Sequence, residues 1–226
     1  MRAFIDILKL ISISALFFIL LSFSLNNNED NVREINLIEI EASKSNFVNY
    51  HDILPIANNK DYDFDVSIIE QNIKKIPQIK DAQVYLNHNG SIDIKINQRV
   101  PILRIYDNDS NYYLDKDCEV MPISRSFTSR EIIVSGDIDH FSNDAICNLY
   151  SIIRSNDFYK SLITQIHLKK NNVVLATRIK NFEINIGDLF FLEKKFNNLM
   201  SFYNKIIKFK GWEYYDQVNL KYIDQI

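Results

Sequence analysis

The chain is poor in the residues that bend or crosslink a polypeptide. Its 226 residues include only 4 glycines, 4 prolines, 2 cysteines and 1 tryptophan. So few glycines and prolines exclude a collagen-like chain or a long flexible linker. Two cysteines are too few for a disulfide framework or a four-cysteine zinc site. A net charge of −3 with 46% hydrophobic residues excludes disorder along the whole length and gives no reason to expect nucleic-acid binding.

Motifs for catalysis or metal binding are missing as well. The four histidines lie far apart without an H-E-x-x-H spacing, and the sequence contains no P-loop, G-x-S-x-G or S-x-x-K. Asp61, Asp63 and Asp65 resemble the start of a calcium loop, but the glycine and glutamate of such a loop are absent, so helix capping is the better interpretation. Cys118 lies in a predicted turn and Cys147 on a predicted helix, and their redox state stays open. We expect no catalytic residue, metal or cofactor.

One uncharged run near the amino terminus indicates a membrane segment. Leu10–Leu25 carries no charge, and Phe4–Leu25 reaches the about 20 residues that a membrane-crossing helix needs if Asp6 and Lys9 lie near the lipid headgroups. Arg2 and Lys9 lie on the amino-terminal side of the uncharged run, and neutral to acidic residues follow it. This charge bias predicts a cytoplasmic amino terminus and an extracytoplasmic location for residues 26–226. The alternative is a cleaved signal peptide ending near Ser22-Phe23-Ser24. Both interpretations export the rest of the chain.

After a polar linker over residues 26–34, the pattern predicts a first α+β unit. Residues 33–41 and 91–97 alternate apolar and polar positions, as strands do, and residues 82–86 form a third predicted strand. Tyr50–Ala57 predicts a short helix interrupted near Pro55. Asp65 can cap a second helix, which Pro77 stops. The predicted order is β-α-α-β-β, with both helices on one face of a three-stranded sheet.

A second predicted unit, starting at Arg104, is rich in short strands. Strand patterns occur at residues 112–114, 119–121, 131–134, 163–168, 173–179, 182–186 and 218–223. Ser142 can cap a helix, and Gly187-Asp188 are expected to open the longest helix of this unit. We therefore predict a domain of mostly antiparallel β-sheet with flanking helices, and an α+β fold class for the whole chain.

Five segments, taken in order, carry a resemblance to one family. They are IPQIKDAQVYLNHNGSIDIKINQRVPIL (76–103), YYLDKDCEVMPI (112–123), IIVSG (132–136), FEINIGD (182–188) and VNLKYIDQI (218–226). Each is a weak match alone, but their order resembles the FtsQ/DivIB family of bacterial cell-division proteins. The chain departs from the family pattern at Gln98, where glutamate is usual, and at Cys118, where glycine is usual.

The resemblance implies a domain plan and a non-enzymatic function. The plan is a cytoplasmic stub and transmembrane anchor (1–25), a linker (26–34), a POTRA domain (35–103) and a β domain (104–226). The implied function is that of a bitopic scaffold of the divisome in the inner membrane, with residues 4–25 in the lipid bilayer. Expected partners are FtsB/FtsL-type small coiled-coil proteins and other divisome components at the septum, where the scaffold influences peptidoglycan synthesis.

The resemblance also points to two sets of residues. A strand at the end of a chain often lies at a sheet edge, where a partner strand can pair with it. The family receives FtsB there, which implies partner binding by Leu220, Lys221, Tyr222 and Asp224. Arg99 and Pro101 are expected at the joint between the domains, where proline fixes an extended backbone.

Two other functions stay open on the sequence alone. A POTRA-bearing factor for protein export or outer-membrane assembly would need several POTRA repeats or a membrane barrel. An anchored envelope hydrolase would need a nucleophile–base pair or a metal cluster.

Overall fold

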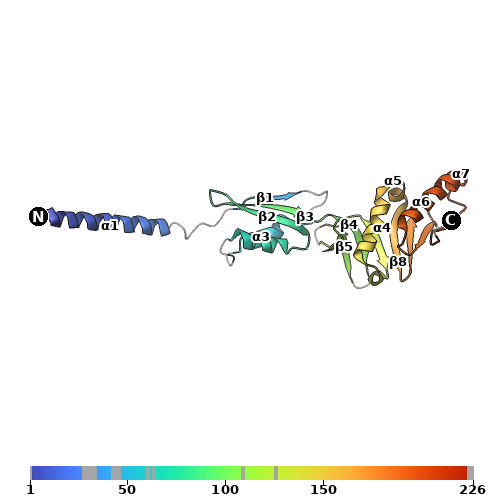
Figure 1. The fold of residues 1–226 in the computed structure, drawn as a ribbon, viewed down its shortest axis with the longest axis horizontal. Coiled ribbons are helices and arrows are strands. Elements are labelled where there is room, and N and C mark those ends of the chain that lie inside the picture. The colour runs from blue at the N-terminus through green and yellow to red at the C-terminus, as the bar shows by residue number, and fades with distance from the viewer. Residues whose placement is uncertain are drawn as a thin grey trace.

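A computed structural model describes residues 2–26, 35–41, 47–59, 62, 65–107, 110–124 and 127–222, and all elements and sheets below refer to these residues. Three parts follow one another along a long axis (Figure 1). They are helix α1 (Arg2–Asn26), a domain with a three-stranded sheet and a domain with an eight-stranded sheet. The two domains adjoin each other, whereas α1 lies apart from both.

Helix α1 is continuous and exposes large apolar side chains, including Ile11, Phe17 and Phe18. The hydroxyls of Ser12 and Ser14 donate hydrogen bonds to backbone carbonyls three residues earlier. Among the residues that the structure describes, no helix meets the length and apolar character that a membrane crossing requires. The helical part of the predicted anchor is thus seen, but a membrane span over residues 4–25 is not confirmed, and linker residues 27–34 lie outside the described residues.

The first domain has the predicted β-α-α-β-β order. Its elements are β1 (Ile35–Glu41), α2 (Tyr50–Ala57), α3 (Val66–Lys74), β2 (Ile79–Leu86) and β3 (Ile92–Gln98). The sheet order is β1-β3-β2, with β1 parallel and β2 antiparallel to the central β3.

Local sequence explains these elements. The Asp65 carboxylate accepts the Ser67 N–H and caps α3, whose Ile69 and Ile73 are buried against the alternating isoleucines of β3. Helix α2 runs through Pro55 without the expected interruption. A proline within so short a helix removes one main-chain bond, and the Asn49–Asp52 capping box holds its first turn.

The second domain contains all remaining elements. They are β4 (Pro101–Tyr106), β5 (Asn111–Asp115), β6 (Val120–Pro122), β7 (Ile132–Gly136), a 3-10 turn (Ile138–His140), α4 (Asn143–Ser155), α5 (Asp157–Leu162), β8 (Ile163–Lys169), β9 (Asn172–Thr177), β10 (Glu183–Gly187), α6 (Leu192–Phe202), a π-helical turn (Tyr203–Ile207), α7 (Lys208–Lys210) and β11 (Gln217–Asn219). The sheet order is β11-β10-β9-β8-β7-β4-β5-β6.

This sheet is mixed, so the expectation of a mostly antiparallel sheet needs correction. Strand β7 is parallel to both β4 and β8, and β11 is parallel to β10. The helical segment Asn143–Leu162 leads from β7 to β8, and such a crossover is what makes a parallel pair possible. The other four pairings in the described residues are antiparallel.

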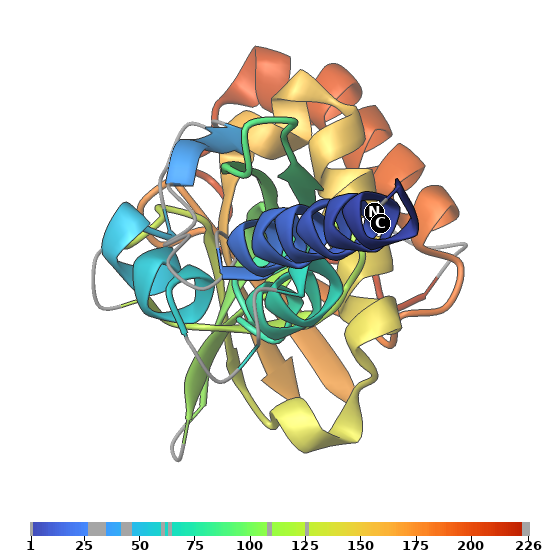
Figure 2. The same cartoon turned by 90° about the vertical axis from the view of Figure 1, so that its left-hand side faces the viewer.

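The helices cover one face of the second sheet, as the view along the long axis shows (Figure 2). Strand residues on that face form one buried core with α4 and α6: Ile105, Leu114, Val134, Ile166, Leu175 and Ile184. The neighbouring positions in the same register include Ser135, His167 and Asn185, which lie on the opposite face. One face therefore forms the main core, and the other carries these polar side chains together with Tyr113 and Met121, which are buried in a small cluster with Phe47.

Several predicted boundaries differ from those of the structure. The expected domain boundary between 103 and 104 falls inside β4, because the second sheet already begins at Pro101. Gly187 ends β10 and Asp188 follows it in a loop instead of opening a helix, and α6 begins only at Leu192. The last strand stops at Asn219, although a strand was expected to continue to Ile223, and residues 223–226 lie outside the described residues.

Candidate protein-binding site

The last strand lies at an edge of the second sheet, and its outward positions can be assigned. Glu183 N–H donates to the Asp216 carbonyl (3.0 Å), and Leu220 N–H donates to the Asn185 carbonyl (2.7 Å). Main-chain groups alternate in direction along a strand, so residues 216, 218 and 220 face β10. Gln217 and Asn219 therefore direct their N–H and C=O groups away from the sheet, where no other described strand pairs with them. This is a free edge of the kind that accepts a further strand.

The four residues predicted to bind a partner occupy different environments. Leu220 is 1% exposed and belongs to the core of its own domain, so its side chain is not available to a partner. Tyr222 is 57% exposed, and the Lys221 Nζ lies 5.9 Å from the centre of its ring. Asp224 lies outside the described residues. Val218 and Leu220 both face this core, whereas Tyr222 does not.

A buried lysine organises the loop beside this edge. Lys195 on α6 is 1% exposed, and its Nζ donates to the backbone oxygen (2.8 Å) and the carboxylate (2.6 Å) of Asp188. The hydrogen bond from Lys195 lowers the pKa of the Asp188 carboxyl, and Lys221 adds a smaller effect in the same direction. The same loop carries Phe190, which is 71% exposed. Sequence patterns gave no signal for a buried lysine here. The buried face of α6 was predicted from the spacing of apolar residues, and a charged residue does not enter such a pattern.

The Asp188–Lys195 pair predicts a pH-dependent contribution to stability. A carboxyl whose pKa is lowered by folding stabilises the fold above its unfolded pKa of about 3.9, and this contribution is lost as the pH falls through the folded value. We expect Asp188→Asn to lower the free energy of unfolding at pH 7 by about 1 kcal/mol or less, because the carboxylate is largely exposed. Urea unfolding at pH 7 and pH 3 measures the difference, which should be smaller at pH 3 because that pH lies below the unfolded pKa. An equal difference at both pH values would contradict the prediction.

Of the two predicted joint residues, Arg99 lies between β3 and β4, and Pro101 is the first residue of β4. Arg99 follows β3, and its Nη1 donates to Asp115 Oδ2 at the end of β5 over 2.7 Å. A second ion pair joins Lys80 of β2 to Asp117 in the turn after β5 (2.5 Å). Pro101 opens β4, opposite Asp115 in the register of the sheet. Two ion pairs therefore connect the first domain to the second at this joint.

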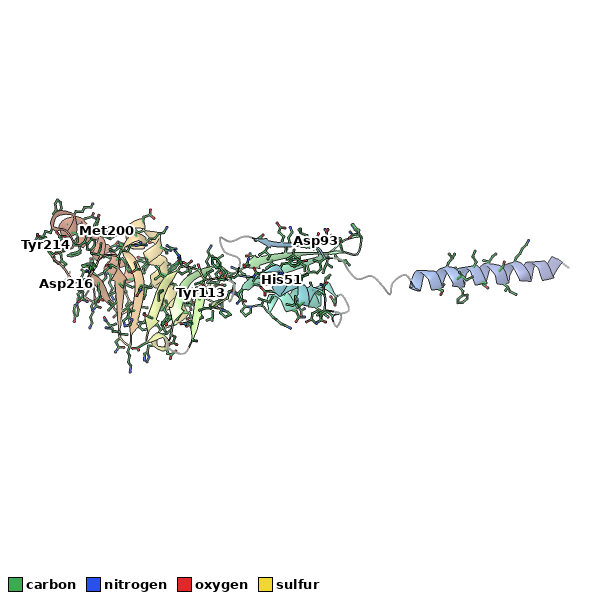
Figure 3. All side chains as sticks on the ribbon, turned by 180° about the vertical axis from the view of Figure 1, so that it is seen from behind. His51, Asp93, Tyr113, Met200, Tyr214 and Asp216 are labelled. Carbon is green, nitrogen blue, oxygen red and sulfur yellow. A yellow bond between two sulfur atoms is a disulfide. The ribbon has the colours of Figure 1, made fainter. Side chains whose placement is uncertain are left out.

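An aromatic contact adds to this joint. Phe47 of the first domain packs edge-on against Tyr113 (5.9 Å between ring centres) and Phe127 of the second. Figure 3 shows Tyr113 where the domains meet. The side-chain oxygen of Gln98 accepts the N–H groups of Phe47 and Val48, so the residue that departs from the family pattern fixes the backbone that carries Phe47.

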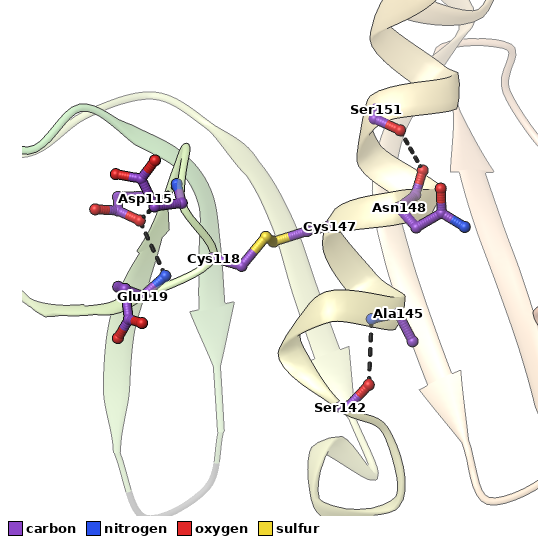
Figure 4. Close-up of a disulfide and its surroundings, with 9 residues drawn as sticks. Asp115, Cys118, Glu119, Ser142, Ala145, Cys147, Asn148 and Ser151 are labelled. Atoms are coloured by element: carbon purple, nitrogen blue, oxygen red, sulfur yellow. Dashed lines mark hydrogen bonds between the residues drawn. A yellow bond between two sulfur atoms is a disulfide. The ribbon is translucent and has the colours of Figure 1, made fainter.

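The two cysteines form a disulfide, which answers the question left open by the sequence. Cys118 lies in the turn between β5 and β6, and Cys147 lies on α4 (Figure 4). Their Cα atoms are 6.2 Å apart although 29 residues separate them in sequence. Cys118 has a φ of 62°, a backbone conformation that glycine adopts most easily, which accounts for glycine being usual at this position.

One polar pair, on the face of the second sheet opposite the core, was missed by the sequence analysis. Ser135 Oγ and His167 Nδ1 are 3.2 Å apart on neighbouring strands β7 and β8. Their separation of 32 residues gave no motif, because parallel pairing brings them together. In the described chain no carboxylate hydrogen-bonds this histidine, and no group of three acidic, histidine or cysteine residues could hold a metal ion. We assign no chemistry to the pair.

Comparisons with known proteins give the family. A family model described as "FtsQ/DivIB, C-terminal related" matches residues 100–226. No curated protein matches the chain. Among solved structures, the major extracytoplasmic domain of the trans isomer of the cell division protein DivIB from Geobacillus stearothermophilus is similar, with a TM-score of 0.33 and 12% identity over 50% of this chain and 97% of that structure. At this TM-score the structural likeness adds nothing to the argument. The family match covers more than half of the sequence, and the chain therefore belongs to the FtsQ/DivIB, C-terminal related family.

Proposed function

We propose that the protein is a non-enzymatic scaffold of the bacterial divisome that binds another polypeptide along β11. Membership of the FtsQ/DivIB family supports a role in cell division. The observation that carries the binding proposal is the free edge of β11, where Gln217 and Asn219 direct main-chain groups outward. A partner strand gains main-chain hydrogen bonds at such an edge, and neighbouring side chains supply specificity.

The partner class follows from the family resemblance. FtsB/FtsL-type small coiled-coil proteins are the proposed partners, with Lys221 and Tyr222 as the side-chain contacts. Tyr222 offers a large exposed ring, and aromatic residues of this kind often dominate binding energy. Leu220 takes no part through its side chain, because it is buried.

The place of action is proposed from the sequence of α1. Leu10–Leu25 is uncharged, helix α1 lies apart from both domains in Figure 1, and its described apolar side chains are exposed. Insertion of this helix into the inner membrane would bury them, and it would hold the two domains on the extracytoplasmic side. The septum is the expected site within that membrane.

A proline at position 217 tests the edge without touching the core. Gln217→Pro removes one outward N–H group and leaves the bonds between β11 and β10, because Gln217 does not face β10. A partner carbonyl left without its donor costs about 1–3 kcal/mol, so we expect partner affinity to fall about tenfold or more. Titration against purified FtsB/FtsL-type proteins measures the affinity. In cells depleted of the native chain, the variant should fail to prevent filamentation.

Gln217→Ala is the matched control, because it removes the same side chain and keeps the N–H group. It should retain affinity and support division. Equal affinity of the proline and alanine variants would reject β11 as the binding edge. Normal division after depletion of the chain would instead reject the scaffold function itself.

A further inference from the structure

The turn between β5 and β6 is the part of the second domain that receives the first domain. At the beginning of this turn, Asp115 forms an ion pair with Arg99 and Asp117 forms one with Lys80. The Asp115 carboxylate is 1% exposed, and its other oxygen accepts the N–H groups of Asp117 and Glu119 (2.9 Å each). The conformation of the turn therefore fixes the positions of the Asp115 and Asp117 carboxylates. Because Arg99 and Lys80 bind these carboxylates, the turn also fixes the position of the first domain.

The disulfide fixes this same turn to the body of the second domain. Cys118 is the turn residue between Asp117 and Glu119, and its N–H donates to the Asp115 carbonyl (3.0 Å). Cys147 is buried on α4, a helix that packs into the main core. Figure 4 shows the bond crossing from the hairpin turn to the helix, with Asp115 and Glu119 next to it. Without this bond the turn is a hairpin tip attached by β5 and the three-residue β6.

We propose that the Cys118–Cys147 disulfide is a redox-sensitive clasp that fixes the orientation of the two domains. The oxidised protein presents Asp115 and Asp117 in one position, so Arg99 and Lys80 hold the first domain at one angle. In the reduced protein the turn moves independently of α4. The ion pairs then no longer define a single angle, although each domain keeps its own core.

The chemistry is exchange with a dithiol. A thiolate of the dithiol attacks one sulfur of the clasp, the sulfur–sulfur bond breaks, and a mixed disulfide forms. The second thiol of the dithiol then displaces it, so two electrons and two protons pass to Cys118 and Cys147 and the reagent becomes a disulfide. Cys118 is half-buried and Cys147 is buried, so the Cys118 sulfur is the accessible point of attack. Oxidation by a disulfide-bearing thiol oxidoreductase reverses these steps.

A distance measurement across the joint tests the clasp. Nitroxide amino acids introduced by genetic encoding at His88 and Lys170, both exposed and one in each domain, report the distance without using cysteine. The full chain is measured by electron–electron double resonance as prepared and after dithiothreitol, with thiol alkylation to verify reduction. We expect one narrow distance distribution in the oxidised protein and a distribution at least twice as broad after reduction.

A variant that folds without the bond provides the second measurement. Cys118→Gly with Cys147→Ala places glycine where φ is positive, which favours the native turn, and removes the tether. It should show the broad distribution with or without dithiothreitol, while circular dichroism verifies that the domains remain folded. Narrow and unchanged distributions in both the reduced protein and the variant would overturn the proposal.

Discussion

Gly136→Ala is expected to lower the free energy of unfolding of the second domain by about 3 kcal/mol or more. Gly136 ends β7 with a φ of +103°, a conformation that other residues rarely adopt. A Cβ atom there would lie 2.0 Å from the backbone oxygen of Leu168, which pairs with Gly136 across β7 and β8. Because that oxygen also accepts the N–H of Asp137 (2.9 Å), the strands cannot separate without losing a hydrogen bond. Urea unfolding followed by circular dichroism measures the loss.

Gly90→Ala is the control for the backbone conformation alone. Gly90 has a φ of +84°, and nothing lies within 4 Å of the position that its Cβ would take. Its cost should be about 1–2 kcal/mol, the ordinary penalty of a left-handed conformation. If both variants lose the same stability, the contact with Leu168 is not the cause and the account of Gly136 is wrong. A larger loss for Gly136→Ala than for Gly90→Ala would explain why the IIVSG segment ends in glycine.

Asp115→Ala is expected to lower the free energy of unfolding by about 3 kcal/mol. Removing one partner of a buried ion pair leaves the other charge without compensation, and such changes cost about 3–5 kcal/mol. The lower end applies because Arg99 is 24% exposed and can regain some water. The turn also loses the acceptor of two backbone N–H groups. Differential scanning calorimetry of the full chain should show the loss in the transition of the second domain.

Lys80→Ala provides the comparison at the same joint. The Lys80–Asp117 pair is about half exposed on both sides, and pairs of this kind contribute between about 0 and 1 kcal/mol. Its loss should leave the transition nearly unchanged. Equal effects of Asp115→Ala and Lys80→Ala would show that burial of Asp115 does not govern the strength of the joint.

The first domain could be predicted from sequence because its signals are local. The alternating isoleucines of β3 and the Asp65 cap of α3 depend on neighbours within a few residues. The helix cap at Ser142 was predicted for the same reason, and its hydroxyl accepts the Ala145 N–H. The family resemblance predicted that the last strand lies at a sheet edge, and the strand order places β11 at one edge of the second sheet.

Features that depend on distant pairing could not be predicted. Parallel pairing of β7 with β4 and β8 leaves the same alternation in sequence as antiparallel pairing does. The disulfide and the Ser135–His167 contact each join residues about 30 positions apart. Leu220 was assigned to a partner from the family resemblance, and the sequence could not correct this, because an apolar residue at a strand end has the same pattern whether it faces its own core or another protein.

The order of the strands separates two surfaces of the second domain. The joint is built on β5 and the turn leading to β6, whereas β11 closes the opposite edge of the sheet. Neighbouring strands are about 4.8 Å apart, so the seven intervals between the outermost strands span roughly 34 Å. A polypeptide docked on β11 would extend the sheet away from the first domain and would leave the surface of the first domain uncovered. The first domain thus stays accessible for simultaneous assembly with a different protein.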